Sequence, residues 1–139
     1  MAEIRIHTDG AARGNPGPAA IAYVIEIPAA DIIEHAETIP ATTNNQAEYQ
    51  ALLAALTKLN DLAPRSDEIT CFADSELMVK QLNGEYKMKN AELRPHFEAI
   101  QKLKMKLEQA DNLVSFVHVR REQNQRADEL GNLALDGEL

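Results

Sequence analysis

Four acidic residues stand where predicted elements of this chain begin or end. Asp9 ends a predicted strand, and Asp74 ends a later one. Glu48 falls in the first turns of a predicted helix, and Asp128 opens the last helix. Ligand sites in α/β sheets lie beyond the carboxyl ends of the strands. We therefore expect the four carboxylates to converge there, although any one acid taken alone would be read as a surface group or a helix cap.

A cluster of carboxylates at such an edge needs a counter-ion. Without one, repulsion between like charges and burial raise the pKa of at least one member. Oxygen ligands favour Mg²⁺ or Mn²⁺, and the lack of a Cys/His cluster in the sequence argues against zinc. Two such ions about 3.5–4 Å apart suit phosphoryl transfer, with one activating water and one steadying the leaving oxygen. The acids therefore predict a divalent-metal site.

The segments that must position these acids switch between strand and helix periodicity. Alternating apolar residues predict strands over 3–8, 19–27 and 32–39, separated by a turn-rich loop over 10–18 and a hairpin turn over 28–31. The later elements are a helix over 44–59, a strand over 68–73, a helix over 75–82, a helix over 91–110 broken or started near Pro95, a strand over 113–119 and a helix over 124–135.

This order of elements predicts the fold class. A strand, a helix and a second strand in sequence make a parallel pair with a right-handed crossover, which makes the first and fourth strands neighbours. We expect an α/β fold with a mixed five-stranded sheet and helices on both faces. The 139 residues suffice for one core and contain no repeat and no Pro/Gly/Ser-rich linker, so we expect a single domain over 1–139.

Composition and charge narrow the class of protein. The net charge of −8 argues against strong non-specific binding to a polyanion, but an acidic site that recruits cations remains compatible with it. No apolar run approaches the ~18 residues of a membrane helix, and the N-terminus lacks a signal-peptide pattern. The single Cys71 fits a reducing compartment. We expect a soluble, cytoplasmic protein with no membrane partner, and a monomer.

Four motifs, in order along nearly the whole chain, resemble type 1 ribonuclease H. They are DGAARGNPGPAAIAYVI from Asp9, TTNNQAEYQALLAAL from Thr42, FADSELMVKQLNGEYKMKN from Phe72 and VRREQNQRADELGNLA from Val119. The resemblance implies a ribonuclease H-like fold and an endoribonuclease that hydrolyses the RNA strand of RNA–DNA hybrids. It implies two ions, Mg²⁺ or Mn²⁺, and products with 5′-phosphate and 3′-hydroxyl ends. The implied catalytic and metal-binding acids are Asp9, Glu48, Asp74 and Asp128.

The same resemblance implies residues that hold the hybrid. They are Gly10, Arg13, Asn15, Thr43, Asn44, Asn45 and Asn124. Short amides both donate and accept hydrogen bonds, which suits minor-groove reading of base edges and of the 2′-hydroxyl that separates RNA from DNA. Thr43 resembles a site that grips a DNA-strand phosphate. Thr and Asn are also good helix caps, and the two roles can coexist.

The loop before the last acid departs from the pattern of many family members. They carry a mobile His in a glycine-containing loop, whereas this loop reads RREQNQ. We expect Arg121 to take the place of this histidine in the catalytic site, because its spacing to Asn124 fits better than that of Arg120. There it would balance phosphate charge or help the product leave. The alternative is a surface ion pair with Glu122. His118 is expected to be a structural strand residue.

A second departure from the family pattern concerns the residues that bind substrate. Within these 139 residues we expect neither a basic protrusion nor an added hybrid-binding domain, and only Lys80, Lys87 and Lys89 surround the relevant segment. We expect weak, salt-sensitive binding. Three alternatives remain: double-stranded RNA as a further substrate, a related nuclease that acts on DNA, and a hybrid-binding module that does not cut. The last is disfavoured because four acids repel phosphate.

Overall fold

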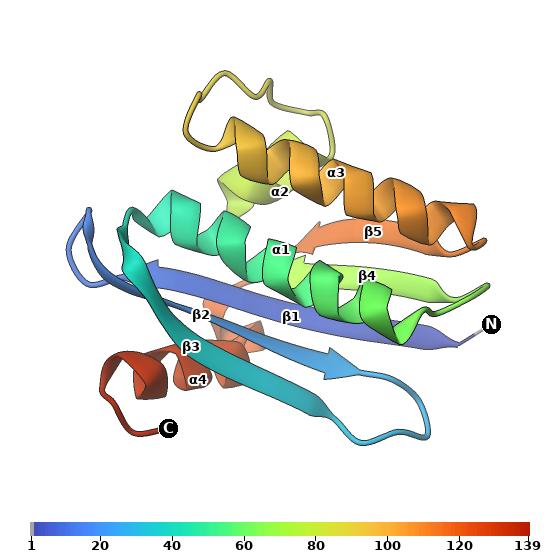
Figure 1. Ribbon diagram of the computed structural model, residues 1–139, viewed down its shortest axis with the longest axis horizontal. Helices are drawn as coiled ribbons and strands as arrows, with labels where there is room; N and C mark the ends of the chain where they lie inside the picture. Colours follow the sequence, from blue (N-terminus) through green and yellow to red (C-terminus); the bar gives the residue numbers. More distant parts are fainter. Residues whose placement is uncertain (1) are drawn as a thin grey trace.

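The computed structural model describes residues 2–139, and its centre is one five-stranded sheet with the order β3-β2-β1-β4-β5 (Figure 1). The strands are β1 (Glu3–Ala12), β2 (Gly17–Glu26), β3 (Ile33–Thr42), β4 (Glu68–Ala73) and β5 (Leu113–His118). β1 pairs antiparallel with β2, and β2 with β3, whereas β1–β4 and β4–β5 are parallel. The predicted mixed five-stranded sheet is confirmed.

Helices cover both faces of this sheet. They are α1 (Asn44–Leu62), α2 (Glu76–Leu82), α3 (Arg94–Gln109) and α4 (Gln125–Leu135), with a short 3₁₀ turn, η1 (Arg121–Gln123), before α4. α1, α2 and α3 contribute buried residues to one hydrophobic cluster, and α4 packs on the opposite face against a second cluster (Figure 1). The prediction of helices on both faces is also confirmed. No helix in residues 2–139 has the length and apolar character needed to cross a membrane.

The two clusters follow from the period-2 alternation of the central strands. Ile4 and Ile6 of β1 face α1, where Leu52 and Leu56 are fully buried. The opposite cluster is small and consists of Ala22, Val24, Ala127 and Leu130. Ala22 of β2 and Ala127 of α4 let the helix lie close to the sheet, because their side chains are small. The starts of α1 and α4 are therefore held on opposite faces near the same strand ends.

Several boundaries differ from the sequence prediction. β1 continues through Ala12, because Gly10–Ala12 of the predicted loop pair with Ala19–Ile21 of β2. The predicted start of a helix near Pro95 is confirmed, because α3 begins at Arg94 and Pro95, which lacks an amide hydrogen, fits its first turn. α1 extends to Leu62 and ends at Ala63, which adopts a left-handed conformation (φ 52°) just before Pro64.

Candidate active site

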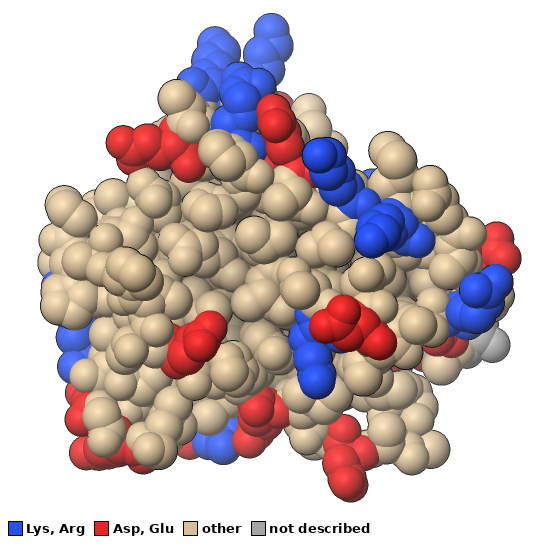
Figure 2. Space-filling model, in the orientation of Figure 1, with Lys and Arg blue, Asp and Glu red and all other residues tan. Residues whose placement is uncertain are grey.

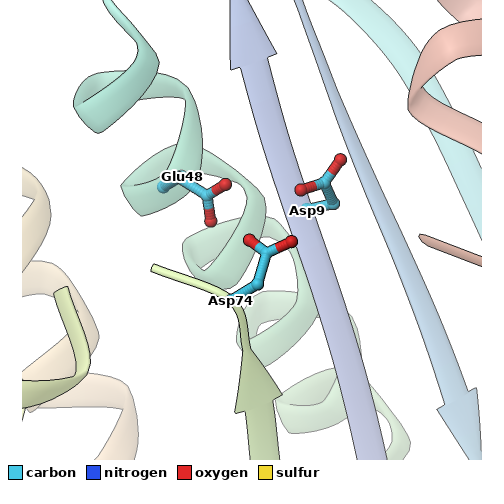
Figure 3. Close-up of side chains that lie close together, drawn as sticks. All are labelled: Asp9, Glu48 and Asp74. Carbon is cyan, nitrogen blue, oxygen red and sulfur yellow. The ribbon is translucent and has the colours of Figure 1, made fainter. Parts of the chain in front are cut away.

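Three of the four predicted acids meet at one edge of the sheet. The parallel ladder between β1 and β4 ends at the pair Thr8 and Ala73, and Asp9 and Asp74 follow directly. Asp9 lies within β1 and not at its end as predicted, because β1 continues to pair with β2. Glu48, on the second turn of α1, faces both (Figure 3). Carboxylate oxygens of the three residues lie within 4.8 Å of one another.

Gly10 allows α1 to approach β1 this closely. A Cβ atom at this position would lie 2.1 Å from the Ala47 carbonyl oxygen, so only glycine fits between strand and helix. The Gly10 amide donates to Glu48 Oε1 at 3.3 Å. Gly10, which the family resemblance places among the substrate-binding residues, is buried here and directs the Glu48 carboxylate toward Asp9.

Asp128 borders this cluster but stands outside its tight group of three. It lies in the first turn of α4, and its charge is among the causes that raise the pKa values of Asp9 and Asp74. One turn later, Gly131 faces Asp9, whose Oδ2 would lie 3.6 Å from a Cβ at that glycine. The first half of α4 therefore lies directly beside the acidic cluster.

Burial and mutual repulsion raise the pKa values of these three carboxyl groups. Asp9 is 6% exposed and Glu48 7%. Burial, followed by the charges of Asp74 and Asp128, raises the pKa of Asp9 to about 7. Burial and the neighbouring Asp9 and Asp74 raise the pKa of Glu48 well above its ordinary value. Burial also raises the pKa of Asp74, opposed by Asn124 and Arg121.

The residues of the cluster fit a hard divalent cation. Glu48 Oε2 is buried and has no hydrogen-bond partner within residues 2–139. An orphan carboxylate oxygen facing two more carboxylates is the donor set that Mg²⁺ and Mn²⁺ prefer. A bound cation would offset the repulsion between the carboxylates and satisfy this oxygen, so the site has the chemistry of a divalent-metal centre.

The structure brings the predicted asparagines of the first two motifs together. The backbone amide of Asn44 donates to Asn15 Oδ1 at 3.1 Å, and the side-chain Oδ1 of Asn44 accepts from the backbone amide of Ala12 at 2.8 Å. These bonds tie the β1–β2 loop to the start of α1, beside exposed Asn45. The Thr43 hydroxyl accepts from the Gln46 amide at 3.2 Å, so its predicted capping role is confirmed.

Two other predicted substrate residues have partners within the protein. Arg13 forms an ion pair with Asp136 at 2.7 Å, which ties the β1–β2 loop to the end of α4. Asn124 is only 1% exposed, and its Nδ2 donates to the Thr8 carbonyl at 2.8 Å. Sequence reasoning missed both contacts. The available signal was the position of Asn124 at the start of the helix that carries the last acid.

Arg121 is placed near the acids. It lies in η1 with an exposed side chain, and its charge is among the causes that lower the pKa values of Asp9 and Asp74. Arg120 precedes this turn, where its amide donates to Gln123 Oε1 at 3.2 Å. His118 ends β5, as the predicted strand residue, with an exposed side chain.

Comparisons with known proteins agree with this geometry. A family described as reverse transcriptase-like matches residues 7–134. The ribonuclease HI of Halobacterium salinarum is 43% identical over 135 residues, which are 95% of this chain and 65% of that protein. The crystal structure of RNase H1 from Halobacterium salinarum NRC-1 has a TM-score of 0.86 at 40% identity, over 97% of this chain and 98% of that one. The chain belongs to the type 1 ribonuclease H family.

Other type 1 ribonucleases H extend the comparison. LC11-RNase H1 in complex with an RNA/DNA hybrid has a TM-score of 0.88 at 43% identity, over 96% of this chain and 97% of that one. A bifunctional protein of Mycobacterium tuberculosis is 33% identical over 138 residues. The chain spans 65% of the length of the Halobacterium protein and 36% of the mycobacterial one. The five-stranded fold is therefore ribonuclease H-like.

Proposed function

We propose that this chain is an endoribonuclease that hydrolyses the RNA strand of RNA–DNA hybrids and leaves 5′-phosphate and 3′-hydroxyl ends. The observation that carries the proposal is the meeting of Asp9, Glu48 and Asp74 within 4.8 Å at the carboxyl ends of parallel strands. The family membership supports the reaction, and LC11-RNase H1 in complex with an RNA/DNA hybrid supports the substrate.

The four acids would hold two divalent ions, Mg²⁺ or Mn²⁺. When bound, these ions supply the Lewis acidity that activates water and stabilises the leaving oxygen. Asp9, Glu48 and Asp74 converge from three elements, and Asp128 adds charge from α4. Without cations this cluster repels phosphate, so the same acids that hold the ions also make substrate binding at the centre depend on them.

The hybrid would lie along the edge formed by the β1–β2 loop and the start of α1. Asn15, Asn44 and Asn45 are exposed there and offer amides to 2′-hydroxyls and base edges in the minor groove. The Thr43 hydroxyl accepts the helix-capping bond and keeps its own hydrogen for a phosphate oxygen. In this proposal Arg13, paired with Asp136, contributes positive charge beside the loop, while Gly10 and Asn124 act from within the protein.

Basic residues gather in one further place. Lys and Arg side chains project over the segment between α2 and α3, at the top of Figure 2, where Lys87 and Lys89 are exposed. With a net charge of −8, the rest of the molecule offers little general attraction to a polyanion. We propose that binding is weak and salt-sensitive, and that this segment takes the place of a larger basic protrusion.

The cleavage proposal is tested with labelled RNA–DNA hybrid, double-stranded RNA and double-stranded DNA, each in Mg²⁺, Mn²⁺ or EDTA. We expect internal cuts in the RNA strand of the hybrid that disappear in EDTA. Cuts in double-stranded RNA as well would widen the substrate class. Hybrid binding in EDTA without cleavage in either metal would contradict the enzyme proposal and favour a binding module.

We also propose that the chain belongs to a subgroup that lacks the loop histidine, with Arg121 in its place. Arginine stays protonated, so it would act on phosphate charge and product release and not as a base. Arg121→Ala is expected to lower kcat about tenfold or more, as for residues that support a metal centre. Arg120→Ala is the matched control, with kcat expected within about twofold. Equal losses in both variants would contradict the assignment.

We propose further that residues 1–139 act as a single ribonuclease H domain, because all four helices pack on one sheet. We also propose a monomer in the cytoplasm. The compartment is supported by the single cysteine, Cys71, which is buried and free.

A further inference from the structure

We propose that Asn124 is a positioning residue whose buried amide aligns the metal-binding acids, a role that rests on the proposed metal-dependent nuclease function. The side chain is 1% exposed, so it has no surface to offer to a bound hybrid. Its Nδ2 donates to the carbonyl of Thr8, the residue directly before Asp9, at 2.8 Å. This bond joins the start of α4 to β1 across 116 residues of sequence.

The backbone of Asn124 holds two more parts of the site. Its amide donates to the Arg121 carbonyl at 2.9 Å, which closes η1. Its carbonyl accepts from the Asp128 amide at 3.1 Å, which begins α4. One residue therefore contacts the neighbour of Asp9, the arginine beside the acids and the fourth acid itself.

The side chain gives up its usual local role to make the bridge. Asn is among the preferred N-cap residues, and a side-chain cap stabilises the start of a helix. Asn124 stands at the N-cap of α4, yet it makes no side-chain capping bond. Its donor is directed to β1 instead. This arrangement favours the relative placement of helix and strand over the stability of the helix end.

An amide suits this place for an electrostatic reason. Four acids already surround the site, and a carboxylate at position 124 would add a further negative charge to a buried cluster. A neutral side chain that donates a hydrogen bond to the Thr8 carbonyl can hold β1 and α4 together without adding charge.

The chain contains a matched control at the opposite edge of the sheet. Asn112 is 2% exposed, and its Nδ2 donates to the carbonyls of Pro64 and Leu107, both at 2.8 Å. Its Oδ1 accepts from the Asp67 amide at 3.0 Å. Asp67 and Asn112 precede β4 and β5, whereas the acids follow β4. Asn112→Ala therefore removes an equally buried amide far from the site.

The test compares full-length Asn124→Ala and Asn112→Ala with the wild type. Melting temperature, calorimetric Mg²⁺ binding without substrate, and kcat and KM on a hybrid are measured at a temperature where each variant is folded. Both variants should melt lower than wild type. Only Asn124→Ala should weaken Mg²⁺ binding and lower kcat, each by about 10–100-fold, with KM for the hybrid nearly unchanged.

A second variant guards against misfolding. Asn124→Ser keeps a residue that can cap α4, while its shorter side chain loses the bridge to Thr8. The same loss of Mg²⁺ binding is expected with a smaller change in melting temperature. A raised KM with normal Mg²⁺ binding would overturn the proposal in favour of a substrate contact, and equal losses in Asn112→Ala would reduce it to general stability. If wild type binds Mg²⁺ but cuts no hybrid, the proposed function fails while the binding comparison still decides the role of Asn124.

Discussion

Replacing Asp9 by asparagine is expected to abolish hybrid cleavage and, at the same time, to make the metal-free protein more stable. Asp9 offers its carboxylate to the centre of the cluster, within reach of both Glu48 and Asp74. An amide supplies one weaker ligand oxygen and no charge. We expect kcat to fall by roughly 10³-fold or more, the range seen when a central catalytic group is removed.

The stability change has a defined pH dependence. The pKa of Asp9 is raised, chiefly by burial, from an ordinary value of 3.8 to about 7. Between these values the folded state binds more protons than the unfolded state, so the free energy of unfolding of the metal-free protein falls as pH rises from about 4 to about 7. Asparagine does not ionise. The free energy of unfolding of Asp9→Asn should therefore exceed that of the wild type by on the order of 4 kcal/mol near pH 8, and by progressively less toward pH 4.

The measurement is thermal unfolding in EDTA across this pH range, beside hybrid cleavage in Mg²⁺. Near pH 8 the variant should melt roughly 10–15 °C higher than wild type. Saturating Mg²⁺ should narrow or reverse the difference, because only the wild type binds the ion well. Asp31→Asn, at an exposed position between β2 and β3, removes the same charge and should change neither property. If the difference in melting temperature between Asp9→Asn and the wild type in EDTA did not change with pH, ionisation of Asp9 would not be its cause.

Replacing Gly10 by alanine is expected to damage both folding and catalysis. The added Cβ would lie 2.1 Å from the Ala47 carbonyl oxygen and 2.5 Å from the Glu48 amide nitrogen. These are backbone atoms, so α1 must move away from β1. We expect a loss of about 3 kcal/mol or more in the free energy of unfolding. Moving Glu48 away from Asp9 should also reduce kcat more than about 10²-fold.

Gly131→Ala is the matched control for this variant. Its Cβ would lie 3.6 Å from Asp9 Oδ2, an ordinary contact distance, and alanine in a helix is favoured over glycine by about 0.5–1 kcal/mol. Its melting temperature should equal or slightly exceed that of wild type, whereas Gly10→Ala should melt roughly 10 °C lower. If Gly10→Ala has the same melting temperature as the wild type, β1 and α1 are not in the close contact described.

Much of the fold could be predicted because its signals are local. The alternation of Ile4 and Ile6 marks a strand, and the helical spacing of Leu52 and Leu56 marks α1. The order of elements then makes β1 and β4 parallel neighbours, which places Asp9 and Asp74 together. The predicted ends of elements were wrong where a neighbouring strand sets them. The continuation of β1 through Ala12, for example, depends on pairing with β2.

Contacts between distant segments lay beyond this reasoning. The ion pair of Arg13 with Asp136 joins a loop to the end of the last helix, and no local pattern indicates it. The bond from Asn124 to Thr8 likewise spans 116 residues. The family resemblance implies substrate contacts for both side chains, and neither residue type nor motif position indicates their partners within the protein.

The sequence by itself determined the identity of the acids, the order of strands and helices and the family, because each depends on residue type and short-range spacing. The tertiary structure decided which acids form the tight group, which carboxyl groups have raised pKa values and which asparagine lies inside. These properties arise from burial and from distances between segments that only packing brings together. Asp128 has the same side chain as Asp9, yet it stands at the border of the cluster because α4 approaches from the other face of the sheet.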